Sequence, residues 1–408
     1  MSFTVNLRKI GLPGLSIALG AFIFSSAARG HESAAAPPEA TGEPVAAVRE
    51  PFEALPVAHT KREASGGSAA RQSGELDRLV NQVQRVLNHY YSKRVINTND
   101  QNCWEVMHWI IAYGVRSRIM RGGAEGSPVN SIGWLCWGGR CAGQPLVLID
   151  QGRIAAAKGV HVQGHHGQFL AILAQAKVMK DYPMRVGNRS FTVADLIETE
   201  KLGCQTGMEL TFKLIALSHY LDLNETWLNS TGEEWSVSRL VQEEIKSPIN
   251  GAACGGTHRL MGLSYAVHER LKRGEPLDGQ FERADIYISD FHRYTFGLQN
   301  PDGSFSTDWF KGRQAKPDLE RRLQTTGHIL EWLVYSVPPE ALTDPRLLRA
   351  VDFLSTMLSK DSDKEWPIGT LGHGLHSLAM FNERVLKEHP SVGNSMARRR
   401  GRTSPSRN

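Results

Sequence analysis

The segment that decides the fold is TTGHILEWLVY, residues 325–335, in which apolar side chains surround the helix axis instead of forming one stripe. A helix of this kind is enclosed on nearly all sides in a folded protein. Similar segments recur along the chain at intervals of 43 to 70 residues. Each carries one polar marker residue, and in chain order these are His108, His166, Glu209, His258, His328 and His373. The pattern predicts six buried inner helices, each of which needs neighbours to cover it.

Amphipathic segments precede most of the inner segments and predict outer helices with one solvated face. They span residues 75–91, 193–202, 237–245, 284–296 and 345–358. Six helix pairs can close into a ring, so the predicted fold class is an all-α, (α/α)6 toroid-like array over residues 74–390, with an open array as the alternative. Residues 131–160 depart from this pattern. Their apolar run at 146–150 and several glycines predict a small β-hairpin insertion.

The first 28 residues have the pattern of a secretory signal peptide. Arg8 and Lys9 provide a positive start, residues 10–24 are mostly apolar, and small residues follow. The apolar stretch is shorter than the roughly 20 residues of a membrane-spanning helix. We therefore expect an exported protein, periplasmic or extracellular, with cleavage near Ala27 or Ala28. An uncleaved N-terminal membrane anchor is the alternative.

Two further segments lack the apolar residues that a folded core needs. Residues 29–73 are rich in Ala, Pro, Glu, Gly and Ser, which predicts a disordered linker. The composition of residues 391–408 predicts a disordered tail. This tail contains five arginines and no acidic residue, and it therefore accounts for the formal net charge of +5 of the whole chain. The body is therefore near neutral, and no nucleic-acid partner is expected. The tail is suited to a weak electrostatic contact with an anionic envelope polymer.

Five cysteines allow more than one interpretation in an exported protein. Cys136 and Cys141 flank a turn that contains glycine, which favours a local disulfide in an oxidising compartment. Cys103, Cys204 and Cys254 remain, so at least one thiol stays unpaired if all pairing is internal. A buried, inert thiol is the default interpretation for each cysteine, and metal ligation or reactivity is the alternative.

Residues 287–305, YISDFHRYTFGLQNPDGSF, resemble the Gln–Trp repeat of the terpenoid cyclase and prenyltransferase-like α/α toroid superfamily. In that repeat an outer helix ends in Gln, here Gln299, and a turn with Asp-Gly leads to an aromatic residue, here Phe305 in place of Trp. Residues 353–366 form a second, degenerate copy. The resemblance implies an α/α toroid fold over at most residues 74–390.

The acidic motifs of the cyclases in that superfamily are missing from this sequence. The nearest string to their Asp-x-Asp-Asp motif is DSDK at residues 361–364, which ends in lysine, and no Asp-Asp-x-x-Asp string is present. We therefore infer no function from the resemblance, and terpene cyclisation is not expected.

Histidines next to small residues are the most informative feature for function. His165, His258, His328 and His373 each follow Gly or Thr at the expected start of an inner helix, and His166 comes directly after the first of them. If the helices run in one direction, their starts meet at one mouth of a cavity. Helix N-termini would add positive potential there, which suits an anionic or sugar-rich ligand. The alternative for each histidine is packing against a nearby backbone carbonyl.

We expect the catalytic groups to be His258, His328, Glu331 and His165. His328 and Glu331 are three residues apart on one helix face, as are Glu105 and His108, so a carboxylate can support an imidazole in acid–base work. The expected substrate-binding residues lie on the same inner segments and are His108, Glu105, His166, Arg259, Trp332 and His373.

The predicted function is that of a lyase or hydrolase that acts on an extracytoplasmic, carbohydrate-like polymer through this histidine-lined cavity. No cofactor and no metal is required by that chemistry. The first alternative is a non-catalytic protein that binds a glycan or peptide or serves as a scaffold. The second alternative is a zinc-dependent enzyme, with Cys254 and His258 as the closest Cys–His pair.

Overall fold

The computed structural model describes residues 66–390 and residue 392. The predicted signal peptide, the linker as far as residue 65 and nearly all of the predicted tail lie outside these residues. The first helix, α1 (Gly66–Lys93), begins eight residues before position 74, where the sequence predicts that the folded body begins. Alanine, arginine and glutamine at 69–72 favour this extension, although the small residues around them are typical of a linker. Within the described chain, no helix is both long enough and apolar enough to cross a membrane.

Six helices contain the segments that the sequence identifies as inner helices. They are α2 (Cys103–Tyr113), α4 (Gln168–Gln175), α6 (Thr211–Tyr220), α8 (Thr257–Lys272), α10 (Leu319–Ser336) and α12 (Ile368–Glu388). Most of their apolar side chains are buried, as expected for helices covered on nearly all sides. Each of these helices contacts the next one along the chain, and α12 contacts α2. The order of contacts therefore returns to the helix from which it started.

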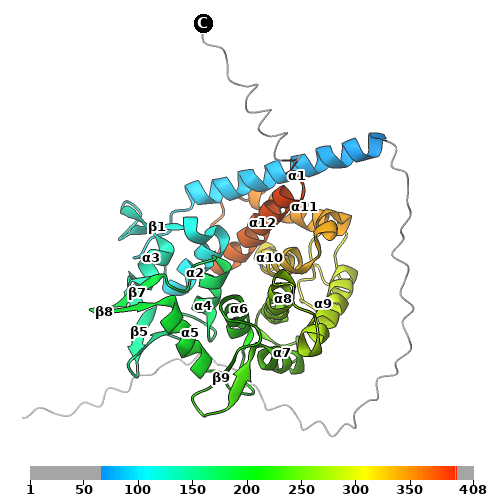
Figure 1. The fold of residues 1–408 in the computed structure, drawn as a ribbon. Helices are drawn as coiled ribbons and strands as arrows, with labels where there is room; N and C mark the ends of the chain where they lie inside the picture. The colour runs from blue at the N-terminus through cyan, green and yellow to red at the C-terminus, as the bar shows by residue number, and fades with distance from the viewer. Residues whose placement is uncertain (1–65, 391, 393–408) are drawn as a thin grey trace, which may run out of the picture. The chain divides into compact units, whose positions relative to one another are not determined.

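A second set of helices covers the first. It consists of α1, α3 (Ser131–Cys136), α5 (Val193–Leu202), α7 (Val237–Lys246), α9 (Gly279–Gly297) and α11 (Pro345–Lys360). Figure 1 shows α7 and α9 beside α8, and both helices contact it, while α11 contacts α10 and α12. In α7 the buried residues recur every three or four positions, which is the amphipathic pattern of an outer helix. The prediction of a helix-rich fold is confirmed.

Five two-stranded antiparallel sheets interrupt the helices in the described chain. They pair β1 (Arg118–Arg121) with β2 (Ser127–Asn130), β3 (Arg140–Cys141) with β4 (Gln144–Pro145), β5 (Val147–Asp150) with β6 (Arg153–Ala156), β7 (Pro183–Val186) with β8 (Arg189–Thr192), and β9 (Thr226–Leu228) with β10 (Glu234–Ser236). The predicted hairpin is confirmed at β5–β6, and β3–β4 precedes it. The other three hairpins are not predicted, because strands of three or four residues are too short to show a period of two.

Part of the predicted hairpin insertion is helical. Residues 131–136 form α3, because the Asn130 side chain accepts a hydrogen bond from the backbone nitrogen of Gly133 and caps the helix. This helix also explains why the local disulfide is not formed. Cys136 is buried at the end of α3, whereas Cys141 lies in β3 and interacts with Cys103 at the start of α2. All five cysteines are free thiols.

Glycines at the contacts between inner helices determine how closely those helices pack. A Cβ atom at Gly372 of α12 would lie 2.4 Å from the carbonyl oxygen of His108 in α2. A Cβ atom at Gly327 of α10 would lie 3.0 Å from the backbone nitrogen of Gly374 in α12, and Gly262 of α8 is equally close to the backbone of α6. These positions have no room for a side chain, so glycine lets the helix backbones touch.

The turn after α9 has the structure that its sequence predicts. The Gln299 amide donates hydrogen bonds to the carbonyl oxygens of Gly303, at 2.9 Å, and of Arg346, at 2.8 Å. It thereby joins the end of α9 to the start of α11. Gly303 has a φ of +93°, and a Cβ atom there would lie 2.3 Å from a backbone oxygen of α11. Phe305 follows the turn and is fully buried.

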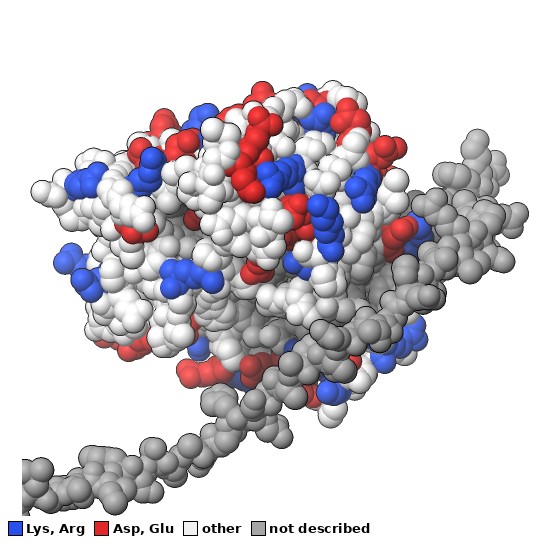
Figure 2. Space-filling view, turned by 90° about the horizontal axis from the view of Figure 1, so that it is seen from below, with Lys and Arg blue, Asp and Glu red and all other residues white. Residues whose placement is uncertain are grey.

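Charged side chains of both signs are interspersed on the face of the molecule that Figure 2 shows. Basic residues do not form a stripe over that face. A protein that binds the nucleic-acid backbone usually presents such a stripe, so this face does not point to a nucleic-acid partner.

We predict that Gly372→Ala lowers the melting temperature. The added methyl group must displace the backbone of α2, and overpacking of this kind costs about 1–3 kcal/mol. Gly297→Ala is the matched control, since Gly297 is also helical and no atom lies within 4 Å of the position of its Cβ. Calorimetric unfolding of both variants tests this, and a Gly372→Ala protein as stable as the control would contradict the packing described here.

Candidate functional site

Five imidazole rings lie next to one another between the inner helices. We refer to them as the histidine cluster, which consists of His108 (α2), His165 (the loop before α4), His258 (α8), His328 (α10) and His373 (α12). The ring centres of His328 and His373 are 3.7 Å apart, and the ring centre of His258 is 5.3 Å from each of them. His108 lies 5.1 Å from His373, and His165 lies 5.8 Å from His258. The structure therefore gathers histidines that are far apart in the sequence.

The histidines do not share a position at the start of their helices, which the sequence pattern predicts. His258 is the second residue of α8 and His165 precedes α4, but His328 is the tenth residue of α10 and His373 the sixth of α12. The prediction is wrong for these two because their neighbouring glycines mark contacts between helices rather than helix starts. The expectation that the N-termini of these helices together create a positive potential at one mouth of a cavity is therefore wrong as well.

Backbone carbonyls hold two rings of the cluster in a defined orientation. The Nδ1 atom of His108 lies 2.6 Å from the carbonyl oxygen of Trp104, and that of His328 lies 2.7 Å from the carbonyl oxygen of Gln324. A carbonyl oxygen only accepts hydrogen bonds, so each Nδ1 carries the proton and donates it. In the neutral ring, Nε2 then keeps the lone pair that can bind a substrate, a proton or a metal ion.

Carboxylates hold three further imidazoles. The Nδ1 atoms of His373 and His376 lie 2.7 and 2.5 Å from the two oxygens of Glu331, and Nδ1 of His165 lies 2.7 Å from Glu209. Burial alone would raise the pKa of the Glu331 carboxyl, but His373 and His376 outweigh it and hold that pKa well below its ordinary value. The predicted support of His328 by Glu331 is not formed as a hydrogen bond, because the carboxylate serves these two other rings.

His258 differs from the rest of the histidine cluster. Its side chain is buried, with an exposed fraction of 8%, and neither ring nitrogen has a hydrogen-bond partner among the described residues. Buried polar atoms are nearly always paired, so this ring needs an explanation. The Cys254 sulfur and one nitrogen each of His258 and His328 lie within 4.8 Å of one another. These three side chains are the group in the described chain that could hold a metal ion.

Burial controls the ionisation of the site. It lowers the pKa of His258 and of His328 well below the ordinary value, and each is lowered further by a neighbouring imidazole. Burial, with a smaller contribution from His373, lowers the pKa of His108 to about 3. Burial also raises the pKa of the Cys254 thiol to about 12. The three imidazoles are therefore neutral near pH 7.

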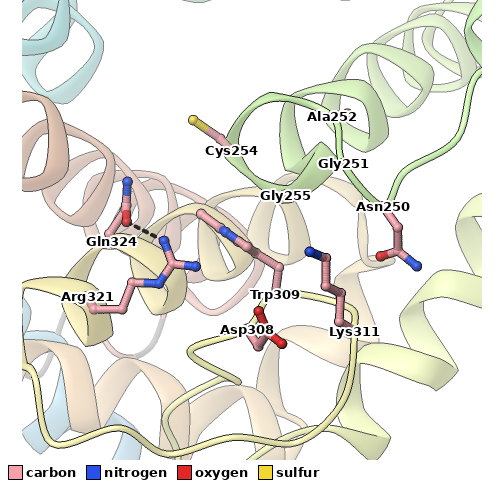
Figure 3. Close-up of a pocket in the computed structure, with 10 residues that line it drawn as sticks. All are labelled: Asn250, Gly251, Ala252, Cys254, Gly255, Asp308, Trp309, Lys311, Arg321 and Gln324. Carbon is pink, nitrogen blue, oxygen red and sulfur yellow. Dashed lines mark hydrogen bonds between the residues drawn. The ribbon is translucent and has the colours of Figure 1, made fainter. Parts of the chain in front are cut away.

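A cavity of about 330 Å³ adjoins the histidine cluster. It is lined by Asn250, Gly251, Ala252, Cys254, Gly255, Asp308, Trp309, Lys311, Arg321 and Gln324 (Figure 3). Cys254 links the cavity to His258 and His328, and the ring centre of Trp309 lies 5.6 Å from that of His328. The lining is polar apart from Trp309 and the turn around Gly255, so it suits a ligand with several hydrogen-bonding groups.

The cavity wall has an aromatic ring between two basic side chains. Figure 3 shows Trp309 between Arg321 and Lys311, next to the turn that contains Gly255. A Cβ atom at position 255 would lie 2.3 Å from the Trp309 side chain, so glycine is required for this packing. The Arg321 guanidinium lies 5.1 Å from the Trp309 ring centre and donates a hydrogen bond to the Gln324 side chain at 2.8 Å.

A second cavity among the inner helices has a volume of about 20 Å³. Its lining includes His108, His258, His373 and Glu331 together with apolar side chains of α4 and α6. A space of this size holds about one water molecule. It is too small for a substrate, and the cavity beside Cys254 and Trp309 is the candidate binding site.

Three residues expected at the site make contacts that stabilise the fold, and a fourth, His166, is not part of the histidine cluster. The Glu105 side chain accepts a hydrogen bond from the N-cap backbone of α2, and Arg259 forms an ion pair with the buried carboxylate of Glu244 at 3.0 Å. Trp332 is fully buried and donates its indole N–H to a serine of α8. His166 is half-buried and makes no ring contact with the cluster in the described chain. Sequence spacing did not distinguish these core positions from positions that face a cavity.

Sequence reasoning also missed the cavity wall. The string DWFKGR at residues 308–313 has two aromatic and two basic side chains in the loop between α9 and α10. That combination is an available signal for ligand binding, but it contains no histidine and lies outside the inner segments. Comparisons with protein-family models, curated proteins and solved structures find no match to this chain. The geometry is therefore the basis for a functional proposal.

We predict that His108→Asn weakens the acid sensitivity of the fold. Between pH 6.5 and about 3 the unfolded imidazole binds a proton that the buried one does not, so the free energy of unfolding falls as the pH decreases through this window. Asparagine retains a donor for the Trp104 carbonyl and does not titrate. Melting temperatures measured across this range should fall less steeply for the variant, and equal slopes would count against the buried neutral ring.

Proposed function

We propose that the chain is an exported (α/α)6 toroid that cleaves an acidic, carbohydrate-like polymer. The observation that carries the proposal is the cavity of about 330 Å³, in which Trp309 and two basic side chains adjoin buried imidazoles. The toroid is supported by the order of helix contacts, which passes from α2 through α4, α6, α8, α10 and α12 back to α2. The turn at Gln299, with its resemblance to the Gln–Trp repeat, supports the same fold.

Export is supported by the signal-like pattern of residues 1–28. An exported enzyme meets the polymers of the cell envelope and its surroundings rather than soluble metabolites. The arginines of the C-terminal tail would assist contact with an anionic polymer of this kind. Both arguments favour a polysaccharide that carries carboxylate groups.

The cavity contains the groups that an acidic sugar unit needs. The Trp309 ring can stack on the apolar face of a sugar ring. Lys311 and Arg321 provide two positive charges for a carboxylate, against the one negative charge of Asp308 in the same lining. The amides of Asn250 and Gln324 are suited to hydroxyl groups. A volume of about 330 Å³ is at the lower end of the range for small-ligand sites, which fits one or two sugar units.

The histidine cluster supplies the reacting groups in this proposal. His258 and His328 are buried beside Cys254, which lines the cavity, and His165 with Glu209 is more exposed than the pairs that Glu331 forms. Glu331 acts as a positioning residue, because its carboxylate orients His373 and His376. Two reactions break a glycosidic bond of a uronate polymer. Hydrolysis adds water across the bond, whereas β-elimination removes the proton next to the carboxylate and expels the glycosidic oxygen, which leaves a double bond.

We predict that the full chain cleaves polygalacturonate, alginate or hyaluronate but not dextran. New reducing ends measure both reactions, and the ultraviolet absorbance of an unsaturated uronate identifies β-elimination. His165→Asn and His328→Asn should each lower turnover by about 100-fold or more, because acid–base groups contribute roughly that much. His89→Asn on α1 is the control that should retain activity. Binding of these polymers without cleavage by the unmodified chain would favour a non-catalytic binding protein.

A separate prediction concerns recognition of the polymer. Trp309→Asn should weaken binding of an acidic oligosaccharide by about two- to tenfold through loss of the aromatic surface. Asparagine is chosen because Trp309 has a φ of +57°, which asparagine tolerates. Lys311→Gln should weaken binding by about two- to fivefold, since an exposed ion pair contributes little. Trp137→Asn and Lys316→Gln are matched controls outside the cavity. Titration calorimetry that finds equal affinities for all four variants would exclude this cavity as the binding site.

A further inference from the structure

We propose that Cys254, His258 and His328 bind one zinc ion whose fourth coordination position is open to the cavity. The inference extends the proposed function, because it names the group through which two of the histidines would act. The three donor atoms lie within 4.8 Å of one another. With Zn–S and Zn–N bonds of about 2.0–2.3 Å, the donors of a tetrahedral site are roughly 3.5 Å apart. Binding would therefore draw the three donors together by about 1 Å.

The unpaired ring of His258 is the first observation that points to a ligand. More than nine-tenths of its surface is buried, and neither nitrogen has a hydrogen-bond partner in the described chain. Removing an imidazole from water without replacing its hydrogen bonds is costly. A packing role does not explain this choice, since an apolar residue would fill the same space at lower cost. A metal ion would bind directly to the unprotonated nitrogen of this neutral ring.

The hydrogen bond of His328 is the second observation. Its Nδ1–H group donates to the carbonyl oxygen of Gln324 at 2.7 Å, so Nε2 keeps the free lone pair. Histidines that bind metal ions almost always donate their other ring N–H to a carbonyl or carboxylate in this way, which fixes the ring orientation. His328 is therefore held in the tautomer that a metal ligand requires.

The backbone at Cys254 is the third observation. Cys254 has a φ of +48°, and Gly255 and Gly256 follow with φ values of +65° and +85°. The Thr257 hydroxyl donates a hydrogen bond to the Cys254 carbonyl oxygen at 2.8 Å and closes the turn. A non-glycine residue in the left-handed region carries strain, and such strain concentrates at functional sites. This turn places the thiol just before the start of α8, on the wall of the cavity.

The donor set selects the kind of metal. One thiolate and two neutral imidazoles favour zinc and similar transition metals over calcium or magnesium, which prefer oxygen ligands. On binding, the Cys254 thiol releases its proton to solvent and its sulfur bonds the metal ion. Three protein ligands leave one position of a tetrahedral ion for water, and Cys254 borders the cavity at that point. A water molecule bound there would lose a proton near neutral pH and act in hydrolysis.

Metal analysis of the full chain, purified without chelators, tests the inference. We expect about one zinc ion per chain, as for a mononuclear site. Loss of a hydrogen bond that supports a metal ligand lowers metal affinity by roughly 10- to 100-fold. Cys254→Ser and His328→Asn each remove a ligand itself, so each should lower zinc affinity by more than this. Asparagine at 328 retains a donor for the Gln324 carbonyl and removes only the metal-binding nitrogen. The control is Cys204→Ser, which changes another buried thiol and should bind zinc normally.

Cobalt provides a readout that does not depend on turnover or on recovery of every variant. Added to the chelator-treated full chain, Co²⁺ should show the thiolate charge-transfer band and the visible absorption of a tetrahedral site. Cys254→Ser should lose the thiolate band, and zinc should raise the melting temperature of the unmodified chain but not of this variant. Failure of the folded, unmodified chain to bind either metal would overturn the inference, as would full retention of the band in Cys254→Ser.

The outcomes also separate this inference from the proposed function. Stoichiometric zinc without cleavage of any acidic polymer would support the metal site and count against the proposed substrate. Cleavage that persists in a metal-free Cys254→Ser protein would support the substrate and contradict the part of this inference by which His258 and His328 act through a metal ion.

Discussion

Direct contact between the backbones of the inner helices is the constraint on which the histidine cluster depends. Gly327 and Gly372 lie where α10 meets α12 and where α12 meets α2. Successive residues of a helix point about 100° apart, so the side chain that follows a contact glycine points to one side of that contact, where it can meet a side chain of the neighbouring helix. His328 and His373 are those residues, and their rings lie 3.7 Å apart. The repeated Gly-His step thus reflects helix packing, with the histidine placed by the glycine before it.

The helical fold could be predicted from the sequence because its signal is long and periodic. Apolar segments of about eleven residues, most of them with an amphipathic partner, predict buried helices, and the inner helices lie where these segments predict them. A shared site for His108, His165, His258, His328 and His373 could be predicted because each lies in an inner segment, although the same argument includes His166, which is not in the histidine cluster. Their depth within each helix could not, since a glycine inside a helix and a glycine at its start look alike in a sequence.

The rest of the site depends on contacts between distant residues. Glu331 and His328 share a helix, yet the carboxylate binds His373 and His376 from α12 because those rings face it across the helix contact. Arg259 and Trp332 lie on inner helices like the histidines, but each has a partner in the core that no local pattern reveals. The short hairpins and the Trp309 loop are likewise defined by tertiary packing. Local periodicity does not contain this information.

The candidate site is built partly from buried helices and partly from a surface loop, and these two parts differ in how well they tolerate substitution. The rings at its base belong mainly to helices packed on every side, where a change of one methyl group is felt by neighbours. Its wall, by contrast, includes loop residues 308–313, and insertions in surface loops are accepted more readily. Ligand preference could therefore diverge among descendants of this chain through the loop alone. The chemistry at the base would be inherited unchanged.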